Sequence, residues 1–148
     1  MSEVARFLRR HRSIALDTSC FIYQIQEHPG YVALTDAVFR WIEEPRHQAF
    51  TSTITMTELL VHGYREDDRQ KIDSFYGLLS LYPNLHWIPP DLETADAAAR
   101  IRAKYKLRTP DAIQAATALR FGATGLVTND PTFARVEGIE TAVLDHFL

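Results

Sequence analysis

Residues 108–118 read RTPDAIQAATA, and this stretch indicates a helix that is buried along most of its length. Thr109 is predicted as the N-cap and Pro110 as the first helical residue, because a hydroxyl side chain and a proline are favoured at these two positions. Asp111 then lies in the first turn, at the open end of the helix. A face of apolar residues, with small residues between them, is expected to pack closely against a flat neighbour, and it comprises Ile113, Ala116 and Leu119.

On both sides of this stretch, short apolar runs alternate with helical patterns. Strands are predicted at residues 13–17, 49–54, 85–88, 126–128 and 140–144. Helices are predicted at about residues 3–12, 20–27, 32–42, 55–64, 72–81, 91–106 and 109–121. Strands that alternate with helices favour an α/β sandwich with a mainly parallel sheet of four to five strands.

The composition fits one globular domain over residues 1–148. Hydrophobic residues make up 46% of the chain, but no apolar run approaches the roughly 20 residues of a membrane span. Cys20 is the only cysteine, which excludes an internal disulfide or zinc-finger framework and suits a reducing cytoplasm. We therefore expect a cytoplasmic protein without a membrane contact. Residues 1–12 are rich in arginine and are predicted to form a basic helix or N-terminal arm.

Four acids lie where a strand or loop gives way to a helix, namely Asp17, Glu58, Asp111 and Asp130. Each has a structural explanation when taken alone. Asp17 and Asp130 could cap the helices that follow them, and Asp111 could respond to the helix dipole. Glu58 could complete a capping box with Thr55, in which two side chains satisfy two free backbone amides.

Taken together, the same acids predict a metal site. Those that follow strands fall at one edge of a parallel sheet, where α/β proteins bind their ligands. Clustered carboxylates repel each other and raise one another's pKa unless cations are present, and the hard divalent ions Mg²⁺ and Mn²⁺ prefer oxygen ligands. Such a site supports metal-assisted displacement at phosphorus. Neighbouring polar residues predicted to support it are Thr18, Ser19, Thr128 and Asn129.

Four short motifs carry a resemblance to a known family: LDTS at residues 16–19, TEL at 57–59, TPDAIQAATA at 109–118 and TND at 128–130. Together they resemble the PIN-domain nucleases, and within these the VapC-type ribonuclease toxins of bacterial and archaeal toxin–antitoxin pairs. The resemblance implies a PIN-like three-layer sandwich with helices on both faces of the sheet. It also implies RNA cleavage that depends on Mg²⁺ or Mn²⁺. Matched by position, the acidic cluster would be Asp17, Glu58, Asp111 and Asp130.

A run of five bases without an intervening acid leads into Asp111. It is either a solvated helix face or a contact for the phosphate backbone of RNA. The candidate RNA-binding residues are Arg102, Lys104, Lys106 and Arg108.

We therefore expect a metal-dependent endoribonuclease that forms a homodimer and is the toxin of a two-protein module. An antitoxin would place an arginine among the acids. It would also pack an amphipathic helix on residues 32–42 or 75–81. Two alternatives remain open on the same fold: an RNA-processing nuclease without an antitoxin, and a non-catalytic module that binds RNA or protein. A dehalogenase-like phosphatase with Asp17 as nucleophile is disfavoured, because Ser19 stands where its second acid belongs.

Overall fold

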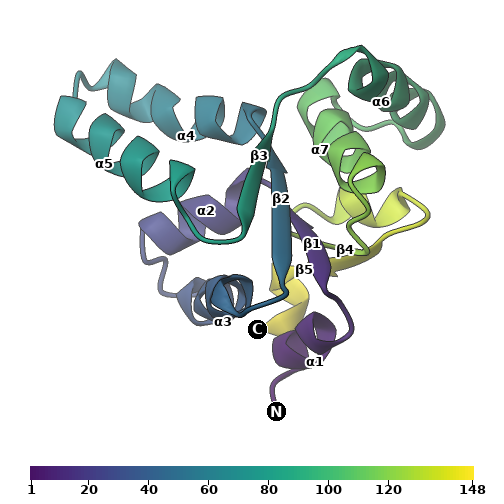
Figure 1. The fold of residues 1–148 in the computed structure, drawn as a ribbon, viewed down its shortest axis with the longest axis horizontal. Coiled ribbons are helices and arrows are strands. Elements are labelled where there is room, and N and C mark those ends of the chain that lie inside the picture. Colours follow the sequence, from purple (N-terminus) through teal and green to yellow (C-terminus); the bar gives the residue numbers. More distant parts are fainter.

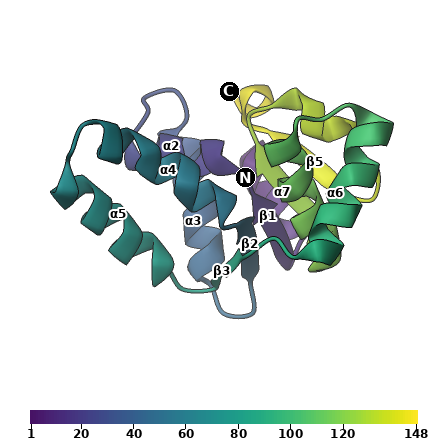
Figure 2. The same cartoon turned by 90° about the horizontal axis from the view of Figure 1, so that it is seen from above.

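The computed structural model describes residues 1–148 and contains one parallel sheet (Figures 1 and 2). Its strands are β1 (Ser13–Leu16), β2 (Gln48–Ser52), β3 (Leu85–Ile88), β4 (Gly125–Thr128) and β5 (Glu140–Val143). They lie in the order β3-β2-β1-β4-β5, and every neighbouring pair is parallel. The chain adds β2 and β3 on one side of β1 and then β4 and β5 on the other. The strand order therefore reverses between β1 and β4, which is where open α/β sheets place their ligands.

Helices cover both faces of the sheet, as Figure 2 shows. They are α1 (Glu3–Arg9), α2 (Thr18–Ile25), α3 (Val32–Glu43), α4 (Ile54–Arg65), α5 (Arg69–Ser80), α6 (Leu92–Tyr105) and α7 (Thr109–Arg120), with short 3₁₀ helices η1 (Pro131–Arg135) and η2 (Leu144–Phe147). None of these helices combines the length and the apolar character of a membrane span.

The sheet separates two hydrophobic cores, and the alternation of side chains along β1 shows how. Ile14 and Leu16 pack with residues of α1, α2 and α3, whereas Ala15 packs with residues of α6 and α7. Successive residues of a strand point to opposite faces, so each face of β1 is buried under its own helices. The predicted α/β sandwich with a mainly parallel sheet is confirmed, and all five predicted strands are present within two residues of their expected ends.

The predicted packing face of α7 is wrong in detail. Its fully buried residues are alanines at positions 112, 115, 116 and 118, whereas Leu119 is 39% exposed. Small side chains let the helix backbone approach α6 and the sheet closely, and a leucine does not fit between such surfaces. The predicted cap also differs. Arg108 occupies the N-cap position without a side-chain bond, and the Thr109 hydroxyl instead accepts a hydrogen bond from Arg102 Nη1 at 2.9 Å.

The basic N-terminal segment is not a free arm. Val4, Phe7 and Leu8 of α1 are buried, each at most 3% exposed, and they join the core that contains α3. Phe7 also packs on Gly125, where an added Cβ would meet the phenyl Cζ at 3.0 Å. Arg10 forms an ion pair with Glu140 at the start of β5. Arg6 and Arg9 therefore lie on the solvent side of a helix that belongs to the fold, and Arg10 and Arg12 are exposed after its end.

Candidate active site

The four acids come from four different elements and lie close enough to influence one another. Asp17 follows β1 and Asp130 follows β4, while Glu58 lies in α4 and Asp111 in the first turn of α7. Burial is the largest cause of a raised pKa at Asp17, Glu58 and Asp111. The negative charge of Asp111 raises the pKa of Asp17 and Glu58 further, and that of Asp130 does the same to Asp111. Asp111 is therefore the acid that is coupled through charge to each of the other three.

Asp17 is the most buried member of the cluster, with 8% of its surface exposed. Its Oδ1 accepts hydrogen bonds from the Ser19 amide at 3.1 Å and the Ser19 hydroxyl at 2.5 Å, and its Oδ2 accepts one from the Thr128 hydroxyl at 2.5 Å. Burial raises the pKa of Asp17 to about 6, although these bonds lower it. Asp17 is the N-cap of α2, as expected. Asp17 therefore caps α2, and its negative charge is at the same time costly because the carboxylate is buried.

The segment after β4 is tied to the same place by two hydroxyl groups. The Asp130 amide donates to Thr128 Oγ1 at 2.9 Å, and the Asn129 amide donates to Ser19 Oγ at 3.1 Å. Asp130 also caps η1 by accepting a hydrogen bond from the Thr132 amide at 2.9 Å. Ser19 and Thr128 therefore each bond Asp17 and, at the same time, hold the backbone that carries Asp130.

Glu58 does not form the predicted capping box. The strand β2 ends at Ser52, earlier than expected, and the Ser52 hydroxyl accepts a hydrogen bond from the Ile54 amide at 3.2 Å. Thr55 consequently lies inside the first turn of α4 with its hydroxyl buried. The Glu58 carboxylate is left without a capping partner. Partial desolvation and the charge of Asp111 raise its pKa, while a hydrogen bond from Thr18 lowers it.

The predicted basic run separates into residues with different surroundings. Arg108 Nε lies 3.3 Å from Asp111 Oδ2, so this base reaches the acids with its side chain 80% exposed. Arg102 is bound within the fold, because it donates to the Leu107 carbonyl at 3.0 Å and to Thr109. Lys104 lies 3.8 Å from a Glu137 carboxylate oxygen. Lys106 ends α6 in the left-handed conformation, with φ of 60°.

Gln114 was not predicted from the sequence as a residue of this region. Gln114 is only 4% exposed and lies three residues after Asp111 on α7. Its Nε2 donates to Thr55 Oγ1 at 2.6 Å, and its Oε1 accepts a hydrogen bond from the Ser52 amide at 3.1 Å. The signal was available in the sequence, because an amide within a run of buried alanines must find hydrogen-bond partners.

The donors of this cluster fit a hard divalent cation. All four side chains offer only carboxylate oxygens, which Mg²⁺ and Mn²⁺ prefer. No three His, Cys, Asp or Glu side chains already lie in an arrangement that could hold a metal ion. However, burial and neighbouring negative charge both raise the pKa of Asp17 and Asp111, and a bound cation would remove this cost.

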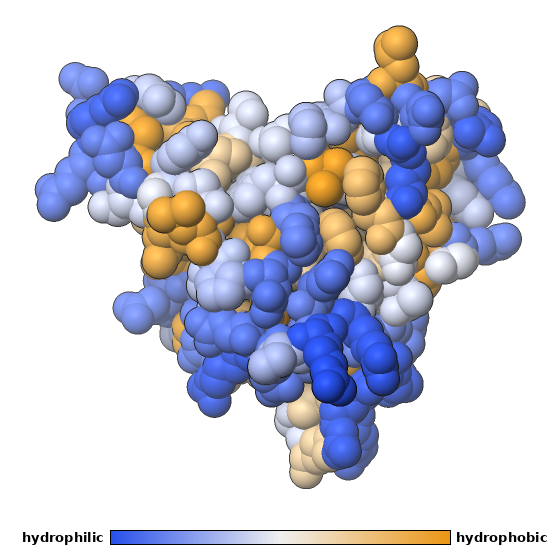
Figure 3. Space-filling view, in the orientation of Figure 1, coloured by the Kyte–Doolittle hydropathy of each residue, from blue (hydrophilic) through white to orange (hydrophobic).

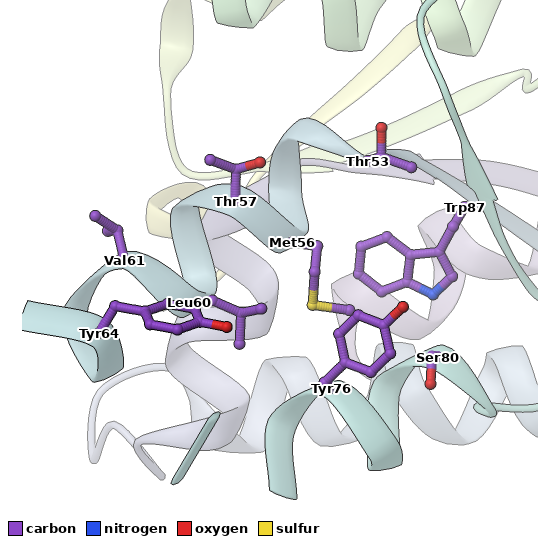
Figure 4. A pocket seen from close by; sticks show the side chains of 9 residues that line it. All are labelled: Thr53, Met56, Thr57, Leu60, Val61, Tyr64, Tyr76, Ser80 and Trp87. Atoms are coloured by element: carbon purple, nitrogen blue, oxygen red, sulfur yellow. The ribbon is translucent and has the colours of Figure 1, made fainter. Parts of the chain in front are cut away.

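An apolar groove lies between α4 and α5, and none of the four acids lines it (Figure 4). It has a volume of about 700 Å³ and includes Thr57, the residue before Glu58. Figure 3 shows hydrophobic patches on this lobe of the molecule among hydrophilic residues. The residues that line the groove are Thr53, Met56, Thr57, Leu60, Val61, Tyr64, Tyr76, Ser80 and Trp87.

The fold defines an α/β protein with a parallel sheet, in which Asp17 and Asp130 follow the two strands between which the strand order reverses. The family model of the PIN domain matches residues 14–139. This chain therefore belongs to the PIN domain family. The helix α1 precedes the matched region. No curated protein sequence was found to match the chain.

Solved structures with the same fold include the following three from bacteria. A toxin–antitoxin complex from Klebsiella pneumoniae is 24% identical, with a TM-score of 0.66, and the match covers 85% of this chain and 94% of that one. VapBC-1 from nontypeable Haemophilus influenzae is 20% identical, with a TM-score of 0.68 and coverage of 90% and 98%. FitAcB from Neisseria gonorrhoeae is 21% identical, with a TM-score of 0.64 and coverage of 90% and 99%.

Proposed function

We propose that this protein is a metal-dependent endoribonuclease and the toxin of a toxin–antitoxin pair. The observation that carries the proposal is that Asp17 and Asp130 follow the two strands between which the strand order reverses, while the charge of Asp111 acts on the pKa of Asp17 and Glu58. A buried Asp17 with a raised pKa is costly to the fold, and such costs are common at functional sites. Membership of the PIN domain family supports a nuclease.

Asp17, Asp111, Asp130 and Glu58 would hold Mg²⁺ or Mn²⁺. When bound, the ion would supply an activated water and neutralise charge that develops on the phosphate. The chain's own residues prepare the site for this. Ser19 and Thr128 fix both oxygens of Asp17. Any carboxylate left without a metal contact could orient the attacking water.

Arg108 is the base that is best placed to contact the RNA backbone. Its guanidinium already reaches Asp111 and remains largely exposed, so it can bind a phosphate at the rim of the acids. Lys104, in the last turn of α6, and Lys106, at its C-cap, are weaker candidates. Arg102 supports the connection itself through Leu107 and Thr109.

The toxin assignment is supported by the likeness to structures of toxin–antitoxin complexes. An antitoxin would lay an amphipathic helix in the groove between α4 and α5 and direct an arginine toward the acids. Of the two surfaces expected from the sequence, residues 32–42 are unsuitable because Val38, Trp41 and Ile42 are buried in the core. The other surface is partly exposed, with Tyr76 lining the groove. Homodimerisation stays a prediction, which the mass in solution would test.

The nuclease proposal is tested with purified protein and a labelled pool of cellular RNA. Cleavage is expected with Mg²⁺ or Mn²⁺ and should stop when EDTA is added. Asp17→Asn and Asp111→Asn should abolish it because each removes a ligand charge while the shape is kept. Asp96→Asn is the matched control, since Asp96 is an exposed acid paired with Arg100 outside the cluster. Full cleavage after removal of the metal would overturn the mechanism.

The toxin assignment has a separate test. A small protein encoded beside this gene, or its C-terminal peptide, should inhibit cleavage, and replacement of its arginines by alanine should weaken the inhibition. A neighbour that neither binds nor inhibits would favour an RNA-processing nuclease. Absence of cleavage with every RNA and metal, together with tight RNA binding, would favour the non-catalytic module.

A further inference from the structure

We infer that Gln114 is a positioning residue that fixes the distance between Asp111 and Glu58 through a buried hydrogen-bond chain. The inference rests on the proposed function, because it assigns Gln114 a role toward two of the proposed metal ligands. Gln114 follows Asp111 by three residues on α7, and Thr55 precedes Glu58 by three residues on α4. The hydrogen bond between Gln114 and Thr55 thus joins the two helices. On each helix the bonded residue lies about one turn away from the residue that carries the carboxylate.

The donor and the acceptor are determined for each hydrogen bond in the series that links Gln114, Thr55, Thr51 and Leu16. The Ser52 amide can only donate, so Gln114 Oε1 faces it and Nε2 must face Thr55. The Thr51 hydroxyl donates its single proton to the Leu16 carbonyl at 2.9 Å. Thr55, 2.8 Å from Thr51, therefore donates to it and accepts from Gln114. The chain runs from α7 through α4 and β2 to the end of β1, directly before Asp17.

Burial makes this series of hydrogen bonds difficult to rearrange. Thr51, Ser52 and Thr55 are each at most 1% exposed, so no water can replace a lost partner at little cost. A buried polar side chain that finds its hydrogen-bond partners in only one arrangement holds the helices and strands that carry it in that arrangement. Outer hydrogen-bond partners of metal ligands orient those ligands in the same way, and their removal typically weakens metal binding by 10–100-fold. Gln114 and Thr55 act here through the helices that carry the ligands.

The test compares three variants of the full chain. Thr55→Val removes the acceptor of Gln114, and with it the acceptor of the Thr18 hydroxyl at 3.4 Å, but keeps the bond between Ser52 and Gln114. Gln114→Leu removes both bonds. Thr117→Val is the matched control, because Thr117 is an equally buried polar residue on α7 whose hydroxyl donates only to its own helix, to the Ile113 carbonyl at 2.7 Å. Thr55→Ser keeps the hydroxyl and serves as the rescue variant.

Two measurements are made: the Kd for Mn²⁺ by titration calorimetry, and crystal structures without metal. Thr55→Val and Gln114→Leu should each raise the Kd for Mn²⁺ by about tenfold, and the double variant should lose little more than either one. Thr117→Val and Thr55→Ser should bind as the natural protein does. The crystal structures should show Glu58 displaced from Asp111 in Thr55→Val and not in Thr117→Val.

An unchanged separation of Glu58 and Asp111 in Thr55→Val, or an equal loss of Mn²⁺ binding in Thr117→Val, would overturn the positioning role. If the natural protein itself binds no Mn²⁺, the proposed function fails. The crystal structures still decide the positioning role in that case, because the displacement of Glu58 is measured without metal.

Discussion

The Thr128 hydroxyl donates a hydrogen bond to Asp17 Oδ2 at 2.5 Å and joins the ends of β4 and β1, the two strands between which the sheet order reverses. The Thr128 hydroxyl oxygen also accepts a hydrogen bond from the Asp130 amide at 2.9 Å. One buried hydroxyl group therefore holds two of the four acids. A single substitution at Thr128 is expected to disturb both.

Thr128→Val should raise the pKa of Asp17 above its present value of about 6, because the hydrogen bond that it removes favours the charged carboxylate. Valine has nearly the same shape, but the Asp130 amide loses its acceptor, so the free energy of unfolding should fall by about 1 to 3 kcal/mol. The pKa can be followed by the ¹³C chemical shift of the Asp17 carboxyl group. Thr124→Val is a suitable control, since Thr124 contacts His11 and Ser13 at the opposite end of β4. A pKa that stays near 6 in Thr128→Val would contradict the role of this hydroxyl.

Asp17→Asn should make the folded protein more stable at neutral pH in the absence of metal. The pKa of Asp17 is raised from 3.8 to about 6 by burial, so the folded state holds the proton more tightly than the unfolded chain. The free energy of unfolding therefore falls as the pH rises from about 4 to about 6, and above that range the charged carboxylate costs the fold about 1 to 3 kcal/mol. Asparagine cannot ionise and escapes this cost.

Urea unfolding at several pH values measures the effect. The stability difference between Asp17→Asn and the natural protein should be present at pH 8 and should shrink toward pH 4. The variant should also lose the stabilisation that saturating Mn²⁺ gives, about 2.7 kcal/mol at one hundred times Kd for a single site. A difference that is the same at both pH values would show that the substitution acts through packing and not through charge.

Much of this architecture was predictable from the sequence because its signals are local. Apolar runs of four or five residues indicated the strands, and Asp17, Asp91 and Asp130 occupy the N-cap positions at which acids are favoured. Features that depend on distant partners were not predictable. Leu119 has the spacing of a core residue, yet the close approach of α7 to α6 and the sheet favours alanines. Thr55 fits the pattern of a cap, but the early end of β2 moves it into the helix.

The roles of Arg102 and Arg108 should separate in RNA binding and stability. Arg108→Gln removes an exposed base beside Asp111, so RNA should bind more weakly, and the slope of log K against log salt should fall by about 0.7 if one phosphate contact is lost. Arg102→Gln should leave the slope nearly unchanged. It should instead lower the free energy of unfolding by about 1 to 2 kcal/mol, because its hydrogen bonds to Leu107 and Thr109 are lost. Equal salt slopes for Arg108→Gln and the natural protein would exclude Arg108 from the RNA contact.

The N-terminal helix supplies the last prediction, because its arginines and its apolar residues should behave oppositely. Phe7 is 2% exposed and packs on Gly125 of the interior strand β4, so Phe7→Ala should lower the free energy of unfolding by about 3 to 5 kcal/mol. Arg6→Gln, one residue earlier on the exposed side, should change it by less than about 0.5 kcal/mol. Chemical denaturation of both variants measures the difference. If Phe7→Ala is as stable as the natural protein, α1 does not belong to the core, and an independent basic arm becomes the better description of residues 1–12.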